Sequence, residues 1–418
     1  MVKSSRISGF YKLGVKERVG KIVELAGLTS EDAKTLSTGL SIEQADQMIE
    51  NVIGTYNQPF GVALNFLING KDYIVPMATE EPSVIAAASN AAKIVRECGG
   101  FSTKSTFPIM IGQIQLTAIG NPENARELIL AEKDDLIRKA NELDPVLVKF
   151  GGGLRDVKIR ILDSIIGKLL VVHLHVDVRD AMGANAVNTM CEALAPRLEE
   201  ITGGKVYLRI ISNYAIERLA RGKAVVSKDV LGGEEVVDGI IACYALADAD
   251  VYRAATHNKG IMNGITAVVL ATGNDTRAVE AGAHSYASRS GVYKPLSIYR
   301  KNADGDLECE IELPAAVGLV GGATKTHPTA RTAVKILGVE SASELSEVLA
   351  AVGLAQNLAA LRALSTEGIQ RGHMELHARN IAVLAGAKGD EAESIAKMMV
   401  GERKIRVDRA KELLEGLK

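Results

Sequence analysis

Two adjacent carboxylates, Glu80 and Glu81, stand directly before Pro82 and Ser83, where the pattern predicts the start of a helix. The helix dipole favours negative charge at this end, so the pair can be ordinary charge placement, with Ser83 in the first turn. Alternatively, one carboxyl group is half-buried, keeps its proton and acts as a general acid. The local pattern by itself favours the first interpretation, because helix starts of this kind are common.

Three further segments each place a polar group of a catalytic type among small or polar residues. Lys259 precedes an apolar helical stretch, where a cation can stabilise an oxyanion as it forms. Asp275 either caps the helix that follows it or ties a lysine into a proton network. His373 and His377 are four residues apart, and a histidine in this C-terminal segment suits proton delivery. A surface lysine, a helix cap and a structural histidine are the ordinary alternatives.

A strongly apolar strand runs into a helix at residues 177–186, and the junction is rich in small residues. Such residues allow close approach of another backbone or of a ligand, and the free N–H groups of a helix start attract phosphate. The junction can therefore cradle a dinucleotide, or it can pack a helix tightly on a sheet, and the sequence leaves both open. Its residues are Asp180, Ala181, Met182, Gly183, Ala184 and Asn185.

His173, His175 and Asp177 alternate along the same strand, so they share one of its faces. Histidine and aspartate gathered on one face can bind a metal ion. The residues between them are apolar, which is the pattern of a strand with one polar and one buried face. We therefore expect no metal site here.

The composition argues against several classes of protein. The 418 residues include 49 lysines and arginines and 51 aspartates and glutamates, which argues against binding to nucleic acid or to an acidic membrane surface. The four cysteines are far apart and form no Cys-x-x-Cys, so neither a zinc ribbon nor a disulfide framework is indicated. We see no apolar run of transmembrane length and no signal peptide, and a cytoplasmic protein is expected.

Several common catalytic and nucleotide-binding motifs are also missing. The chain contains neither G-x-G-x-x-G after a strand nor G-x-x-x-x-G-K-[ST], so a Rossmann site and a P-loop are not indicated. It contains neither G-x-S-x-G nor H-E-x-x-H, which weakens the serine hydrolase and zinc protease interpretations.

Hydrophobic patterning predicts how the chain is organised. Residues 14–50 read as amphipathic helices, residues 60–77 as a hairpin turning at Asn69-Gly70, and Pro82 opens a helix closed by Gly99-Gly100. Strands interleave with helices near 122–143 and 184–201, which predicts a compact α+β unit inserted at about 106–217. After residue 218, alanine, glycine and leucine predict long helices that continue to the C-terminus.

Six stretches give the chain a family resemblance. They are residues 50–56 (ENVIGTY), 80–89 (EEPSVIAAAS), 180–185 (DAMGAN), 257–264 (HNKGIMNG), 273–281 (GNDTRAVEA) and 372–382 (GHMELHARNIA). In these stretches the chain resembles class II 3-hydroxy-3-methylglutaryl-coenzyme A (HMG-CoA) reductases, the soluble prokaryotic form. The stretches keep the family's order, and the resemblance runs from near residue 6 to beyond residue 380, which is nearly the whole chain.

The resemblance implies roles for named residues. The implied catalytic residues are Glu81, Lys259, Asp275 and His373. The implied contacts to the acyl group or coenzyme A are Ser83, Arg253, Asn263 and Gln356. Residues 180–185 would bind the dinucleotide and Asp144 would hold its adenosine ribose. The chain departs from the family near its N-terminus, where Tyr11 replaces an expected arginine that contacts coenzyme A.

The resemblance also implies an architecture. The expected α+β fold has a large, mainly helical acyl-CoA-binding domain, divided into residues 1–105 and 218–371. A ferredoxin-like, non-Rossmann dinucleotide-binding domain is inserted at 106–217, and a helical flap follows at 372–418. The implied assembly is a homodimer with its active sites at the subunit interface.

The implied reaction is the four-electron reduction of HMG-CoA to mevalonate and coenzyme A by two molecules of NADH or NADPH, without a metal ion. Asp144 favours NADH, because an acidic residue at the ribose repels the extra phosphate of NADPH. The same enzyme acting oxidatively in mevalonate catabolism, or a non-catalytic acyl-CoA-binding regulator, is the alternative. Lys259 and Asp275 can share one site only if the helix between them breaks at Gly264 or if two subunits contribute.

Overall fold

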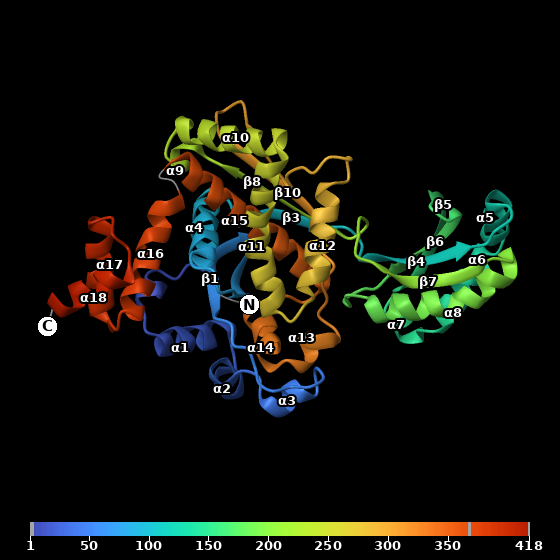
Figure 1. Ribbon diagram of the computed structural model, residues 1–418, viewed down its shortest axis with the longest axis horizontal. Coiled ribbons are helices and arrows are strands. Elements are labelled where there is room, and N and C mark those ends of the chain that lie inside the picture. Colours follow the sequence, from blue (N-terminus) through green and yellow to red (C-terminus); the bar gives the residue numbers. More distant parts are fainter. Residues whose placement is uncertain (1–3, 367–368, 417–418) are drawn as a thin grey trace.

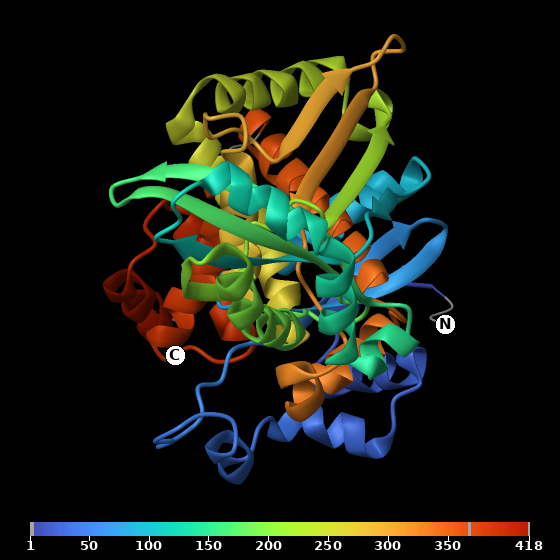
Figure 2. The same cartoon turned by 90° about the vertical axis from the view of Figure 1, so that its right-hand side faces the viewer.

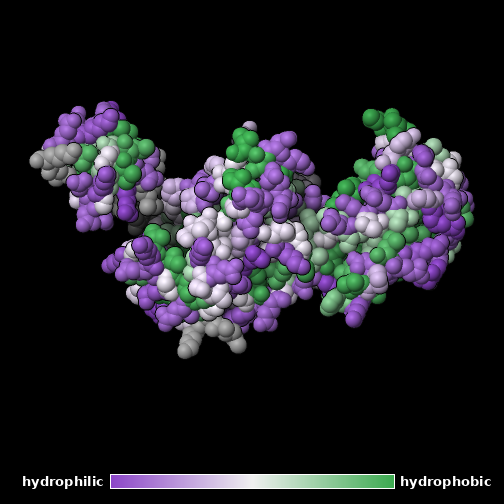
Figure 3. All heavy atoms as spheres, turned by 90° about the horizontal axis from the view of Figure 1, so that it is seen from below, coloured by the Kyte–Doolittle hydropathy of each residue, from purple (hydrophilic) through white to green (hydrophobic). Residues whose placement is uncertain are grey.

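The computed structural model describes the backbone of residues 4–366 and 369–416, and the side chains of 4–366 and 377–416. These residues form a central body, with a small lobe on one side and a helical C-terminal unit on the other (Figure 1). A view from below shows the same three bodies in a row (Figure 3). The expected α+β class is confirmed, because the helices accompany separate small sheets.

The predicted hairpin is confirmed near the N-terminal end of the central body. Strands β1 (Phe60–Ile68) and β2 (Lys71–Ala78) pair antiparallel, and Ile68 opposes Lys71 across the turn. Asn69 and Gly70 both have positive φ, 50° and 78°, as a tight hairpin turn of the primed type requires. The end of β2 leads directly to Glu80 and Glu81.

A second sheet corrects the prediction that residues after 218 are only helical. Its order is β3-β8-β10-β9, formed by β3 (Ser102–Ser105), β8 (Leu219–Val226), β9 (Ser297–Lys301) and β10 (Leu307–Pro314). In β10, buried apolar residues alternate with glutamates, which is the period of a half-buried strand. The two-residue period of these short strands was missed because the sequence around them, rich in alanine and glycine, was interpreted as helical.

The helices of the central body cover both sheets. They are η1 (Phe10–Lys12), α1 (Val15–Ala26), α2 (Ser30–Thr38), α3 (Ile42–Asp46), α4 (Val84–Glu97), α9 (Lys228–Leu231), α10 (Glu234–Ala249), α11 (Val251–Ala271), α12 (Thr276–Ala287), α13 (Gly322–Thr326), α14 (Pro328–Leu337) and α15 (Ala342–Ser365). By length and hydropathy, α15 is the one described helix that could span a membrane. However, 67% of its apolar window is buried, and it packs on α4, α11 and β8, which is the position of a core helix.

The small lobe has a sheet and a hydrophobic core of its own. Its elements are β4 (Ile109–Thr117), α5 (Pro122–Ala131), α6 (Lys133–Glu142), α7 (Pro145–Lys149), β5 (Gly153–Ser164), β6 (Gly167–Asp177), α8 (Ala184–Thr202) and β7 (Lys205–Ser212). The antiparallel order β5-β6-β4-β7 is the ferredoxin-like arrangement, with α5, α6 and α8 packed against its strands. Figure 2 looks onto this lobe, in front of the central body.

The small lobe leaves the central body and returns to it between two paired strands. The chain departs after β3 and comes back at β8, and Ser105 of β3 pairs with Ala220 of β8. The hydroxyl of Thr106 donates to the carbonyl of Glu217 at 2.7 Å and accepts from the Leu219 N–H at 2.8 Å. The two connections therefore run side by side and are hydrogen-bonded to each other.

The C-terminal unit consists of α16 (Ile369–Leu384), α17 (Asp390–Gly401) and α18 (Val407–Gly416). Its buried side chains, among them Ile395 and Met399, form a core separate from those of the other two bodies. Of the central body, α15 is the element that α16 contacts most.

Candidate active site

The end of β2 and the middle of α11 form a pocket of about 200 Å³. Lys259 Nζ lies 2.8 Å from Glu81 Oε2, and Asn263 Nδ2 donates to Glu81 Oε1 at 3.3 Å. Because Lys259 and Asn263 are four residues apart on α11, their side chains leave the helix on the same face. Three residues singled out in the sequence, Glu81, Lys259 and Asn263, thus meet in one pocket.

The ion pair in this pocket remains open to solvent. The exposed fraction of the side chain is 60% for Lys259 and 37% for Glu81. An ion pair as exposed as this adds little to the free energy of folding. A contribution to stability therefore does not explain why a lysine and a glutamate meet in this concave site, which makes the pair a candidate for contact with a ligand.

The helix after Glu81 begins differently from the prediction. α4 starts at Val84, so Pro82 precedes the helix, and Ser83 occupies the N-cap without a capping hydrogen bond from its side chain. Ser83 has φ of 74°, a left-handed conformation that is strained for a residue with a side chain and that is frequent at ligand sites. The Ser83 hydroxyl is not engaged in capping, although it does not line the 200 Å³ pocket.

Asp275 lies apart from Lys259 within this chain. α11 is a continuous helix through Gly264, so no break brings its ends together. A helix of this length separates Lys259 from the α11 C-terminus by about 18 Å. Asp275 instead caps α12, where its Oδ1 accepts hydrogen bonds from the N–H groups of Arg277 and Ala278 at 3.0 and 3.1 Å.

Two residues that were not assigned a role from the sequence line the same pocket. Glu280 and His284 are one turn apart on α12, and His284 Nε2 lies 3.0 Å from Glu280 Oε2. Burial alone would raise the pKa of Glu280, but hydrogen bonds from His284 and Thr266 hold it below its ordinary value. The i,i+4 spacing of a glutamate and a histidine was the available signal in the sequence.

The junction of β6 and α8 has the geometry of a cradle. Gly183 is the N-cap of α8 with φ of 104°, and a Cβ there would lie 2.6 Å from Val178 Cγ1. A side chain is therefore excluded at the point where the first N–H groups of α8 lack a side-chain cap. The loop also packs on the central body, because Asp180 Oδ1 accepts from the Ala342 N–H at 2.8 Å. Both interpretations of this segment, tight packing and a phosphate-accessible helix start, are compatible with the structure.

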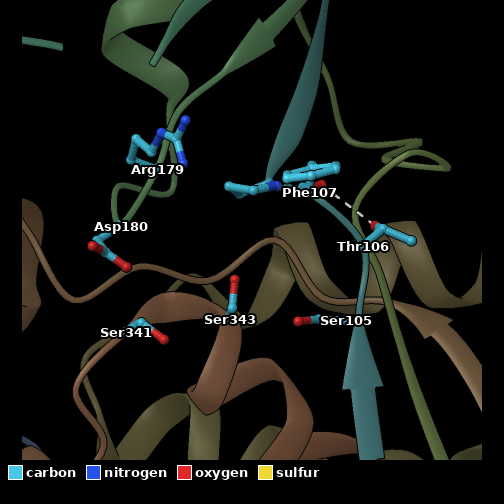
Figure 4. Close-up of a pocket in the computed structure, with 8 residues that line it drawn as sticks. Ser105, Thr106, Phe107, Arg179, Asp180, Ser341 and Ser343 are labelled. Atoms are coloured by element: carbon cyan, nitrogen blue, oxygen red, sulfur yellow. Dashed lines mark hydrogen bonds between the residues drawn. The ribbon is translucent and has the colours of Figure 1, made fainter. Parts of the chain in front are cut away.

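A larger cavity, about 560 Å³, lies between the small lobe and the central body. Figure 4 shows Arg179 and Asp180 on one side, Ser341 and Ser343 at the start of α15 on another, and Ser105 to Phe107 on the third. This cavity contains none of Glu81, Lys259 or Asn263. It marks the junction of the two bodies rather than the pocket of the ion pair.

Comparison with known proteins shows the family. The model of hydroxymethylglutaryl-coenzyme A reductase matches residues 14–378. An HMG-CoA reductase of Archaeoglobus fulgidus is 63% identical over 416 residues, which cover 99% of this chain and 95% of the relative. The chain belongs to the HMG-CoA reductase family.

Solved structures of the family have the same fold. An HMG-CoA reductase from Streptococcus pneumoniae matches with a TM-score of 0.85 and 41% identity, over 98% of this chain and 99% of that chain. A class II reductase of the same organism, bound to NADPH in open conformations, matches with a TM-score of 0.83 and 41% identity, over 97% of this chain and all of that chain. The resemblance stated from the motifs is thus confirmed, and this chain is an oxidoreductase of the HMG-CoA reductase family.

The remaining residues implied by the reductase resemblance lie in different places. Gln356 on α15 is buried against Gly264 of α11, and its Oε1 has no hydrogen-bond partner among the described residues. Arg253 lies in the first turn of α11, and Asp144 caps α7 by accepting from the Leu147 N–H at 2.8 Å. Neither Arg253 nor Gln356 lines the 200 Å³ pocket.

Two further positions complete the comparison with the reductase pattern. His373 lies on α16, and its side chain is outside the described residues. Tyr11, at the position of the expected arginine, is 78% exposed on η1.

The histidine face of β6 has the polar-face geometry rather than that of a metal centre. His175 Nδ1 lies 2.8 Å from Glu217 Oε2, and His173 Nε2 lies 3.0 Å from Gln113 Nε2 on the neighbouring strand. The intervening Val172 and Leu174 are fully buried in the core of the small lobe. No group of three metal-binding side chains occurs in the described part of the chain.

Proposed function

We propose that this chain reduces the thioester of HMG-CoA to the primary alcohol of mevalonate in the pocket that joins Glu81 and Lys259. The observation that carries the proposal is the approach of Lys259 Nζ to Glu81 Oε2 at 2.8 Å, beside the amide of Asn263. This arrangement places a cation beside a carboxyl group, and a carbonyl that accepts a hydride needs both a positive charge and a group that can deliver a proton. Following the absorbance of NADH or NADPH after addition of HMG-CoA tests the proposal, and absence of HMG-CoA-dependent oxidation would contradict it.

The polar groups of the pocket have different roles in the proposed reaction. Hydride addition to the thioester carbonyl leaves a negative oxygen, and the Lys259 ammonium neutralises it as the charge forms. In the second reduction Glu81, after taking up a proton from solvent, donates that proton to the aldehyde oxygen as this oxygen becomes a hydroxyl. Asn263, which already contacts Glu81, orients the carboxyl group. The hydride itself comes from a bound nicotinamide dinucleotide in its reduced form.

The thiolate released between the two reductions needs a proton. We assign this donation to His373, since an imidazole titrates near neutral pH. The hemithioacetal collapses to the aldehyde, the C–S bond breaks, and the coenzyme A thiolate takes the proton. The C-terminal unit that carries His373 would close over the site and exclude water.

Residues 180–185 are proposed to hold the dinucleotide. The fit is supported by Gly183, where a Cβ is excluded, and by the uncapped N-terminus of α8, whose N–H groups suit a pyrophosphate. The related Streptococcus pneumoniae reductase binds NADPH. By the same proposal the small lobe, residues 106–217, is the dinucleotide domain, the central body binds the acyl-CoA, and residues 372–418 form the flap.

The choice between NADH and NADPH is expected to depend on Asp144. The unmodified enzyme should react faster with NADH, because the Asp144 carboxylate repels the 2′-phosphate of NADPH. Asp144→Asn keeps the oxygen that caps α7 and removes the charge. The ratio of initial rates, NADPH to NADH, should then rise about fivefold, which corresponds to ~1 kcal/mol of repulsion removed. An unchanged ratio would show that Asp144 does not face the ribose.

We propose that the enzyme is a cytoplasmic homodimer in which Asp275 of one subunit completes the site of the other. Two observations support this assembly. α11 is unbroken from Lys259 to its end at Ala271, which keeps Asp275, the N-cap of α12, away from Lys259 within the chain. In addition, the stretch around residues 50–56 exposes Ile49, Ile53 and Tyr56, and clustered apolar side chains of this kind mark protein interfaces.

Mixed dimers test the shared site directly. Lys259→Ala and Asp275→Ala subunits should each be nearly inactive alone. An isolated dimer with one subunit of each kind should recover about half of the unmodified activity, because one of its two sites then has both residues. Two differently tagged chains, purified through both tags, give this species. A mixed dimer as inactive as its parents would place Asp275 in the site of its own chain.

A further inference from the structure

Arg218 is a deeply buried arginine to which the proposed reaction gives no role. It lies in the connection from the small lobe to β8, and only 4% of its surface is exposed. No described carboxylate forms a salt bridge with it. Burial lowers the pKa of Arg218 to about 10, although the charges of Asp180 and Asp177 oppose this shift. A guanidinium this deep is costly unless its donors are satisfied.

Backbone carbonyl groups satisfy those donors. Arg218 Nη1 donates to the carbonyl oxygens of Ala181 and Met182 at 3.1 and 3.0 Å. Arg218 Nη2 donates to the carbonyl oxygen of Val317 in the central body. Charge-assisted hydrogen bonds are stronger than neutral ones, and the planar fork of arginine fixes the relative positions of its acceptors. One side chain therefore joins residues 181–182 of the small lobe to the 315–320 segment.

The 315–320 segment is hydrogen-bonded to the turn that carries Asp275. The N–H of Gly318, next to Val317, donates to Asn274 Oδ1 at 2.7 Å. The N–H of Leu319 donates to the carbonyl of Asp180 at 2.8 Å. A chain of direct contacts thus runs from the loop proposed to bind the dinucleotide, through Arg218 and Gly318, to the residue preceding Asp275.

We infer that Arg218 is the positioning residue that fixes the dinucleotide loop, residues 180–185, against the catalytic half of the enzyme. The inference rests on the proposed dinucleotide site. Because the C=O and N–H of a trans peptide point in opposite directions, holding the Met182 carbonyl toward Arg218 turns the Gly183 N–H away from it. Arg218 then sets both the direction of the loop's donors and the place of the loop relative to the acyl pocket.

The contact between residues 181–182 and the 315–320 segment leaves no space for an added side chain. A Cβ on Gly318 would lie 2.4 Å from the backbone nitrogen of Met182 and 2.9 Å from the carbonyl carbon of Ala181. Gly318 is not among the glycines with positive φ, so alanine is conformationally acceptable there. A Gly318→Ala variant therefore separates the same two segments as an Arg218 variant, without touching the arginine.

The test compares the binding of two ligands by the full-length protein. Arg218→Lys keeps the charge and loses the fork. It should raise the Kd of NADPH, measured by fluorescence titration, at least tenfold, while the Kd of HMG-CoA, measured by calorimetry, stays within twofold. Gly318→Ala should show the same selective loss and remains informative if Arg218→Lys does not fold. The controls are Arg221→Lys, whose partner is Glu312, and Gly20→Ala, with open space around it; neither should change either Kd.

Other outcomes are decisive too. If folded Arg218→Lys or Gly318→Ala has an NADPH Kd within twofold of that of the unmodified protein, the inference is overturned. An equal rise in the Kd of NADPH and of HMG-CoA would also overturn it, because such a rise indicates a general structural role. Unmodified protein that binds NADPH but does not oxidise it with HMG-CoA would refute the proposed reaction and leave the role of Arg218 standing. Unmodified protein that binds no nicotinamide dinucleotide would overturn both.

Discussion

Replacing Lys259 by alanine should lower the turnover number for HMG-CoA about 10²–10³-fold, the usual cost of removing an oxyanion stabiliser. The Michaelis constant for HMG-CoA should change little, because the ammonium meets full negative charge only after the hydride has been added. Steady-state rates with saturating reduced dinucleotide measure both quantities. Turnover within a few-fold of the unmodified enzyme would remove Lys259 from its role.

Lys223→Ala is the matched control for this experiment. Lys223 pairs with Glu310 at 3.1 Å, and their side chains are 49% and 37% exposed, close to the values of the Lys259–Glu81 pair. Loss of this pair removes a similar surface interaction outside the pocket, so turnover should be unchanged. The comparison separates the catalytic effect of Lys259 from the general effect of breaking an exposed ion pair.

A chain that ends at Thr366 should fold but lose reduction of the thioester by at least about 10²-fold, the contribution expected of a general acid. α16, α17 and α18 bury their own core, so their removal leaves the central core of residues such as Leu354 and Leu358 intact. The absorbance of the reduced dinucleotide with HMG-CoA measures the loss, and a circular dichroism melt checks the fold.

Supplying the aldehyde intermediate separates the two reductions and so tests which of them needs the C-terminal unit. When mevaldehyde is supplied directly, no thiolate leaves, so the truncated chain should retain much of this second reduction. In the full chain, His373→Ala should reproduce the selective loss, whereas His377→Ala should not; His377 is exposed on the same helix. Full thioester reduction by the truncated chain would refute both the proton donor and the flap.

Local features of the fold were predictable from the sequence. The β1–β2 hairpin depends on Asn69 and Gly70, whose positive φ values are a property of the turn itself. The inserted α+β lobe was predictable because apolar strands alternate with helices, whereas its ferredoxin-like strand order was implied only by the family resemblance. By contrast, β8 pairs with β3 and β10, which lie about one hundred residues away in either direction, and a short strand with distant partners leaves a weak local signal.

In the candidate site, too, residues in local motifs were predictable from the sequence, whereas contacts between distant segments were not. Glu81, Lys259 and Asn263 stand in recognisable motifs, and the structure brings them together. Arg218 was not singled out, because it follows Glu217 and has Arg221 nearby, a pattern that resembles a solvated surface. Its burial arises only from the docking of the small lobe on the 315–320 segment. In the proposed homodimer Asp275 acts in the site of a second copy of the chain, and a single sequence does not display such a contact.

The way the ferredoxin-like lobe joins the rest of the molecule has an evolutionary consequence. Its entry and exit strands, β3 and β8, are already partners in the host sheet, and Thr106 ties the two connections together. The host sheet would be topologically complete if a short turn replaced the guest. A gene encoding such a host can gain, exchange or lose the inserted lobe in one recombination event, because the pairing of β3 with β8 does not depend on the residues between them.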